Sequence, residues 1–236
     1  METYTDYKLS NELKFYNQTK YRKEYYGYED MNLSLNFNFY DSFSDNIATQ
    51  DSFKIKNVSN RIGIKGNSKL FNYDIYGNFG YFKYHVNALE NSFSEIYVGG
   101  LLKYKNPSFD VVSNFEIKKS SDYRLKVDLK SKIFEASYLS ALYEPKIFER
   151  IYLGNHYSWQ NNFNSSFVNN LNAKINLENR FITFSPSINF YTIKDHIYFV
   201  GDNHLQADQV ITFNQFIVNL KLKLLNNKIN FDNKFT

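Results

Sequence analysis

The chain has 236 residues, a net charge of +4 and no cysteine, and its 21 tyrosines and 23 phenylalanines make it rich in aromatic side chains. The cysteine count excludes disulfides, thiolate metal sites and a cysteine nucleophile. A transmembrane helix is excluded because no run of about 18 apolar residues occurs. The basic residues are dispersed, so no nucleic-acid-binding patch is indicated.

Alternation of apolar and polar residues predicts strands from the first residues onward. A first strand is predicted over about 7–16, although Asn11 interrupts it, while residues 17–30 have no clean period and are left open between a loop and a distorted strand. The clearest alternation is Met31–Tyr40, which is typical of a strand with one dry and one wet face. A polar loop is expected over 41–51.

Nine further strands and the start of a twelfth are predicted along the rest of the chain. They lie over about 57–66, 71–81, 95–104, 109–118, 123–130, 133–143, 163–175, 182–190, 216–223 and from 229 onward. Long connections are expected over 83–94, 144–160 and 194–209, although Ile197–Val200 could extend a flanking strand. Residues 176–180 are predicted to be a short turn.

Three features favour a membrane barrel over a soluble sandwich. The predicted strands have about 9–11 residues, enough to cross a bilayer at a tilt. Their starts recur about every twenty residues, which exceeds sandwich spacing. Short and long connections tend to alternate, with exceptions after the first and sixth strands. We therefore predict an all-β, antiparallel up-and-down transmembrane β-barrel with about 12 strands in this chain, forming a single domain over 1–236.

The two ends of the chain suggest a piece of something larger. The first residues lack the basic segment and apolar core of an export signal, and the alternation that begins at Ile229 stops after a few residues. We expect an internal fragment of a longer barrel, incomplete at both ends.

In the predicted strands over 109–118 and 123–130, every charged residue lies on one parity. A lysine or arginine facing lipid at mid-depth would cost about 2–4 kcal/mol, so this parity is predicted to face a wet lumen. A soluble sheet with one solvated face would order its charges in the same way. The predicted lumen-facing residues are Arg61, Lys65, Asp74, Glu95, Lys103, Asp110, Glu116, Arg124, Lys126, Asp128, Lys130, Lys174, Lys221 and Lys223. The predicted lipid-facing residues are Leu33, Leu35, Phe37, Phe39, Phe71, Tyr73, Ile75, Val98, Val111, Phe115, Leu125, Val127, Phe184, Ile188, Val218 and Leu220.

Basic residues outnumber acidic ones in the predicted lumen, which would favour anions. The alternative is that these charges pair across neighbouring strands and only keep the lumen wet.

Little in the sequence points to catalysis. His85, His156, His196 and His204 lie in or beside the expected long connections, without metal-ligand spacing and without a cluster of carboxylates. His156 with Ser158 is the one pair that a hydrolase could use. Gly201, Asp202 and Asn203 are typical of a turn rather than a calcium site. No catalytic residue, metal or cofactor is predicted, and the chain is not expected to be an enzyme.

One segment resembles a known family. Gly154–Phe163 reads Gly-Asn-His-Tyr-Ser-Trp-Gln-Asn-Asn-Phe, and Ser185–Phe199 ends in Ile-Tyr-Phe. This pattern is similar to the putative porins of Bacteroidota outer membranes, with Asn155, His156, Trp159, Asn161 and Asn162 as the matching residues. The resemblance implies an outer-membrane barrel without known catalytic residues.

The function expected from these observations is a porin-like channel for passive diffusion of small polar or anionic solutes, or a barrel component of an envelope complex. Its partners would be outer-membrane lipid, small polar solutes and possible envelope proteins or further copies of the chain, but no nucleic acid. A lipid-hydrolysing barrel enzyme and a soluble adhesin-like β protein are the alternatives.

Overall fold

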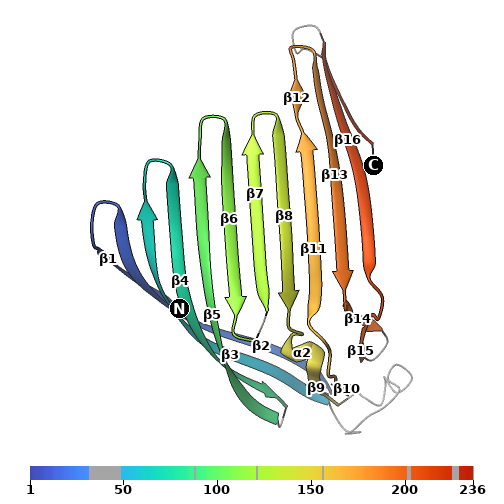
Figure 1. The fold of residues 1–236 in the computed structure, drawn as a ribbon. Helices are drawn as coiled ribbons and strands as arrows, with labels where there is room; N and C mark the ends of the chain where they lie inside the picture. Colours follow the sequence, from blue (N-terminus) through green and yellow to red (C-terminus); the bar gives the residue numbers. More distant parts are fainter. Residues whose placement is uncertain are drawn as a thin grey trace.

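The computed structural model describes residues 1–31, 49–87, 89–120, 122–155, 157–200, 203–224 and 229–235, which contain one large antiparallel sheet (Figure 1). Strands that follow one another in the chain lie side by side, in the order β1-β2-β3-β4-β5-β6-β7-β8-β11-β13-β16-β17 with β12 beside β13. The predicted all-β, up-and-down antiparallel fold is therefore confirmed. The strands are β1 (Glu2–Lys8), β2 (Leu13–Asp30), β3 (Thr49–Asn67), β4 (Phe71–Val86), β5 (Leu89–Lys105), β6 (Phe109–Lys118), β7 (Tyr123–Ser131), β8 (Phe134–Tyr143), β11 (Ser166–Ile175), β12 (Leu177–Glu178), β13 (Ile182–Lys194), β16 (Ile211–Leu224) and β17 (Ile229–Phe235).

The two ends of the sheet differ. At the upper end in Figure 1, hairpins join β1 to β2, β3 to β4, β5 to β6 and β7 to β8, and we call this the turn end. At the lower end, called the connection end, lie the connections that follow β8 and β13, which are the longest among the described residues. Such asymmetry is typical of outer-membrane barrels. No helix in the described part of the chain is long and apolar enough to cross a membrane.

The long connections contain small elements of their own. The connection after β8 holds helix α2 (Ile147–Arg150) and a hairpin of β9 (Ile151–Leu153) and β10 (Ser158–Gln160). The connection after β13 holds a hairpin of β14 (Ile197–Val200) and β15 (Asn203–Gln206). Ile197–Val200 therefore does not extend a flanking strand, because it pairs with β15 in a separate sheet.

The prediction for the first thirty residues was wrong in detail. Residues 7–16 form the end of β1, a turn and the start of β2 rather than one strand. Ser10 closes the turn because its hydroxyl accepts hydrogen bonds from the backbone of Glu12 and Leu13, at 3.2 and 3.1 Å. Asn11, which broke the alternation, lies in this turn. Residues 17–30 are regular strand within β2.

The long loop predicted over 83–94 is also wrong. β4 and β5 stay paired as far as Val86 and Leu89, and Asn87 turns the chain with a positive φ of 49°, a conformation that asparagine tolerates better than most residues. The side chains of Lys83, His85 and Glu90 made this segment look like a loop.

Two smaller predictions also changed. Phe163, predicted to open a strand, precedes β11, which begins at Ser166. Residues 176–180, predicted as a simple turn, include β12. Most of the stretch Met31–Tyr40, with Leu33, Leu35, Phe37 and Phe39, lies outside the described residues.

The strand register separates the side chains of the sheet into two faces. Residues that pair across strands share a face, so the register can be followed from β2 to β16. One face, called the charged face, carries the alternate set that includes Arg61, Asn78 and Tyr97. The opposite set, which includes Ile62, Gly77 and Val98, forms the apolar face. Many large apolar side chains of this second face are exposed, which is the reverse of a water-soluble protein.

Candidate functional site

Thirteen of the fourteen residues predicted to face a lumen belong to the charged face, as the register shows, and the side chain of Lys223 lies outside the described part of the structure. Several form ion pairs there. Arg61 lies 3.8 Å from Glu116, Lys65 lies 3.7 Å from Asp74, Lys130 lies 3.9 Å from Glu135, and Lys126 lies 2.9 Å from Asp128. These distances support the alternative in which charges pair on this face. Described members of the predicted lipid-facing set, from Phe71 to Leu220, all belong to the apolar face.

Tyrosines and glycines alternate across four strands of the charged face. The register places Tyr16 opposite Gly63, Gly63 opposite Tyr76, and Tyr76 opposite Gly99. A side chain at Gly63 or Gly99 would meet a tyrosine ring, since an added Cβ would lie 2.6 Å from Tyr16 or 2.5 Å from Tyr76. The rings of Tyr16 and Tyr76 therefore lie over the neighbouring glycines, where a side chain would collide with them.

The hydroxyl groups of these tyrosines are tied to acidic side chains. Tyr16 donates to Asp74 at 2.8 Å and Tyr76 donates to Glu116 at 2.6 Å. The Arg61 guanidinium lies 3.9 Å from the centre of the Tyr76 ring, a cation–π distance. The charged face is thus a cross-linked layer of aromatic and ionic groups.

The apolar face forms a band between two aromatic borders. At the turn end, Phe71, Tyr104 and Phe109 are in ring contact, with centroids 4.9 and 5.6 Å apart. Toward the connection end, Tyr21 of β2 and Tyr81 of β4 border the band on this face, and a lysine follows each of them on the same face, Lys23 and Lys83. The eleven residues Phe71–Tyr81, at a rise of about 3.3 Å and a usual tilt of about 40°, span about 25 Å along a membrane normal. This height matches the apolar band of outer-membrane barrels.

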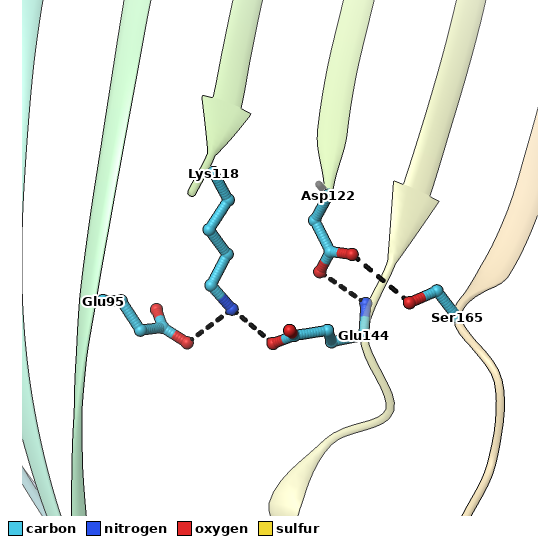
Figure 2. A network of polar contacts seen from close by, with 5 residues as sticks. All are labelled: Glu95, Lys118, Asp122, Glu144 and Ser165. Atoms are coloured by element: carbon cyan, nitrogen blue, oxygen red, sulfur yellow. Dashed lines mark hydrogen bonds and ion pairs between the residues drawn. The ribbon is translucent and has the colours of Figure 1, made fainter. Parts of the chain in front are cut away.

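Residues 144–165, the connection after β8, fold onto the charged face, and we call them the cap. Figure 2 shows how the cap is held at β6: the Lys118 ammonium lies 2.7 Å from Glu95 and 2.6 Å from Glu144. Asp122, which is almost buried, accepts hydrogen bonds from the Glu144 backbone at 2.7 Å and from the Ser165 hydroxyl at 3.3 Å. Both ends of the cap are therefore tied to the β6–β7 connection.

The charge of Glu144 depends on this network. Burial opposes ionisation, but hydrogen bonds from Lys118 and Ser120 outweigh it and hold the pKa of Glu144 below its usual value. The carboxylate is therefore charged throughout the neutral pH range.

Trp159 is the centre of the cap. It is buried, its indole donates to the Phe148 carbonyl at 2.8 Å, and its ring stacks on Tyr152 with centroids 4.7 Å apart. The ring of His204, on β15, lies 5.1 Å away, so the hairpin β14–β15 packs against the cap. The Asn161 amide donates to the Glu149 carbonyl at 3.1 Å and to Asn203 at 3.0 Å. Trp159 and Asn161, which carried the family resemblance, thus fold the connection.

Asp51 ties the cap to the first strands of the sheet. Its carboxylate accepts hydrogen bonds from the Asn155 backbone at 3.0 Å and from the Asn87 amide at 3.0 Å. The Asn155 side chain donates to the Thr49 hydroxyl at 2.7 Å. The Tyr152 hydroxyl donates to Asp51 at 3.4 Å, and burial together with this carboxylate raises the pKa of Tyr152 to about 12.

Two motif residues remain. His156 lies outside the described residues, and Asn162 is exposed. The sequence interpretation missed Asp51, Asp122 and Tyr152. Nothing in the local pattern distinguished them, because their partners lie far along the chain.

A cavity of about 940 Å³ lies between the cap and the charged face. Its lining combines both signs of charge with aromatic rings. The charged lining residues are Arg22, Glu24, Asp51, Glu95, Glu116, Lys118, Asp122, Arg124, Glu144, Lys146 and Arg150. Aromatic and aliphatic side chains such as Phe53, Phe93 and Phe148 lie between these charges, so apolar atoms form most of the cavity surface.

The remaining histidines are dispersed. His85 Nδ1 lies 3.1 Å from Glu90 on the apolar-face side, and His196 stacks on Tyr198. No group of three His, Cys, Asp or Glu side chains among the described residues is arranged to hold a metal ion.

Comparison with known proteins defines the family. The sequence profile described as "Putative porin" matches residues 3–236. The chain belongs to this family. Among solved structures, it is similar to the copper transporter OprC, an outer-membrane barrel, with a TM-score of 0.63 at 9% identity over 92% of this chain. The chain spans 42% of the length of OprC, and the likeness shows the fold alone. No curated protein matches.

Proposed function

We propose that the chain forms part of an outer-membrane channel in which the apolar face meets lipid and the charged face lines a water-filled path. The observation that supports this most directly is the separation of the faces: the ion pairs of Arg61, Lys65 and Lys126 lie on one face, while the exposed apolar band covers the other. A sheet packed against another sheet would cover its apolar side chains. The cap also folds onto the charged face, so it would narrow a channel lined by that face.

The solutes are small and polar, and they pass by diffusion. The lining groups already bond to one another through hydrogen bonds and ion pairs, so they bind a passing solute only weakly. Weak binding allows the solute to leave the channel. The excess of basic residues in the predicted lining, nine against five acidic ones, favours anions modestly, because much of this charge is paired. The cavity under the cap is the mouth of the path.

Reconstitution of the full-length protein into planar bilayers tests this function. We expect stepwise conductance and, in a salt gradient, a weak preference for anions. The double variant Lys103→Glu/Lys174→Glu should shift the reversal potential toward cations, because both positions belong to the charged face. The matched control Lys54→Glu, on the opposite face beyond the apolar band, should leave it unchanged. Absence of conductance in the full-length protein would overturn the proposal.

The proposed role is passive and needs neither catalysis nor a cofactor. The chain would act by itself, together with further copies of itself, or as a barrel component of an envelope complex. The hydrolase alternative depends on His156 and Ser158. If it were correct, the variant His156→Ala would abolish lipid hydrolysis by the purified protein, whereas we expect no hydrolysis with either form.

A further inference from the structure

A row of lysines crosses the outward side of the sheet directly beyond the apolar band. Lys23 is the register partner of Lys56, and Lys56 is the partner of Lys83, so three lysines stand opposite one another on β2, β3 and β4. The preceding row on the same face consists of Tyr21, Val58 and Tyr81. We call Lys23, Lys56 and Lys83 the lysine row.

The lysine row is electrostatically unbalanced. Like charges directly opposite one another across strands repel, and here two such pairs are adjacent. Glu90 is the acidic side chain near the row, and it contacts both Lys83 and His85. Lys54 adds a further positive charge in the next row, where its ammonium lies 5.4 Å from the centre of the Tyr25 ring. Lys23, Lys54 and Lys56 are all exposed.

The position of the lysine row indicates which kind of anion would neutralise its positive charge. An anion bound by Lys23 and Lys56 lies beside Tyr21 and Val58, at the border of the apolar band. A free anion would gain no binding energy from contact with this apolar border. A lipid whose phosphate contacts the lysines can lay its acyl chains on the band, and tyrosines at such borders are typical of the membrane interface. The chemistry on both sides of the border therefore fits a phosphate-bearing lipid.

We propose that the lysine row binds the phosphate groups of an anionic lipid in the leaflet at the connection end of the sheet. This inference rests on the proposed function in one respect, namely that the apolar face meets lipid. It adds a specific lipid site that the channel itself does not require. The long connections place this leaflet on the outer side, because long loops of outer-membrane barrels face outward.

Native mass spectrometry of the full-length protein in detergent micelles tests the site. The probe is diphosphorylated lipid A, with phosphatidylcholine as the neutral comparison. The triple variant Lys23→Gln/Lys56→Gln/Lys83→Gln should bind lipid A at least about tenfold more weakly than the unmodified protein. The matched control Lys65→Gln/Lys126→Gln/Lys174→Gln, on the charged face, should bind as the unmodified protein does. A change of electrophoretic mobility on heating, equal to that of the unmodified protein, verifies that both variants are folded.

The outcomes separate the site from the channel. Equal lipid A binding by the lysine-row variant would overturn the site even if the protein conducts. Displacement of lipid A by inorganic phosphate at an equal concentration would also overturn it, because the row would then be a site for free anions. If lipid binding is lost in the variant while neither form conducts, the site stands and the channel proposal fails. Unchanged conductance of the variant together with lost lipid binding supports both.

Discussion

Single residues decide how the cap is held on the sheet. Asp51 is 7% exposed and accepts hydrogen bonds from two segments that are far from it in the chain, Asn87 and the cap residues Tyr152 and Asn155. Trp159, the single tryptophan of the chain, reports on this contact because it lies in the same cap. Removing a charged acceptor takes a hydrogen bond away from donors that are partly buried, which is costly.

The variant Asp51→Ala should therefore loosen the cap. We expect the free energy of cap opening to fall by about 2 kcal/mol, with a red-shifted Trp159 emission and faster quenching by acrylamide. Asp6→Ala is the control, because Asp6 on β1 forms an exposed ion pair with Lys14 on β2 and its loss should leave the emission unchanged. An unchanged spectrum in Asp51→Ala would show that Asp51 does not hold the cap.

Glu144 makes the same cap sensitive to acid. Because its pKa is lowered in the folded protein, its stabilising contribution is present at neutral pH and is lost as the pH falls through that lowered value. Glu144→Gln should lower the free energy of unfolding at neutral pH by about 1 kcal/mol, since the pair with Lys118 is partly exposed. Urea unfolding at several pH values measures this, and the difference between the two proteins should disappear in acid. A difference that persists there would contradict the role of its charge.

At the scale of strands, the alternation of tyrosine and glycine lets the tyrosine rings of the charged face lie close to the backbone of the neighbouring strands. Gly99 provides the space on which the Tyr76 ring lies, and the ring in turn brings its hydroxyl to Glu116. Gly77 lies on the opposite face of β4, where an added Cβ would meet nothing within 4 Å. Gly77 on β4 is therefore a suitable control position for Gly99 on the neighbouring strand β5.

Replacing these glycines by alanine should give opposite results. Gly99→Ala displaces the Tyr76 ring and should lower the free energy of unfolding by about 1–3 kcal/mol. Gly77→Ala should be neutral or slightly stabilising, because alanine restricts the unfolded chain more than glycine does. Urea unfolding of both variants in the same lipid vesicles makes the comparison. Equal losses would mean that the ring of Tyr76 moves without cost.

At the scale of the whole molecule, the environment of each face distinguishes a channel from a soluble sheet. Val127 belongs to the apolar face of β7, and Ser137 belongs to the charged face of β8 opposite Asp128. In water, a lysine at either position would be tolerated. In a bilayer, the two positions differ strongly because lipid cannot solvate an ammonium group.

Val127→Lys should lower the free energy of unfolding in lipid vesicles by about 2–4 kcal/mol. Ser137→Lys should change it by less than about 1 kcal/mol, since the new ammonium group lies beside Asp128 in water. Similar small effects at both positions would contradict the lipid assignment and favour the soluble β protein.

The alternation of residue types in the sequence determines most of the sheet. Strands such as Phe109–Lys118 and Tyr123–Ser131 could be predicted, together with the face of each side chain, because a period of two is a local property of the backbone. The same rule failed at 83–94 and in the first turn. At 83–94 the strands β4 and β5 leave the apolar band and the two faces change character, because Lys83, His85 and Glu90 occupy the face that is apolar elsewhere while Tyr84, Val86 and Phe93 pack together on the other.

Only the tertiary structure decided what the long connections do. Trp159 and Asn161 stood out in the sequence, but their partners Phe148, Tyr152 and Asn203 come from separate elements that folding brings together. Asp51 and the lysine row likewise depend on register, since Lys23, Lys56 and Lys83 meet only when three strands are aligned. Local patterns determine which face a residue occupies, whereas contacts between distant segments depend on pairing and packing that no local pattern encodes.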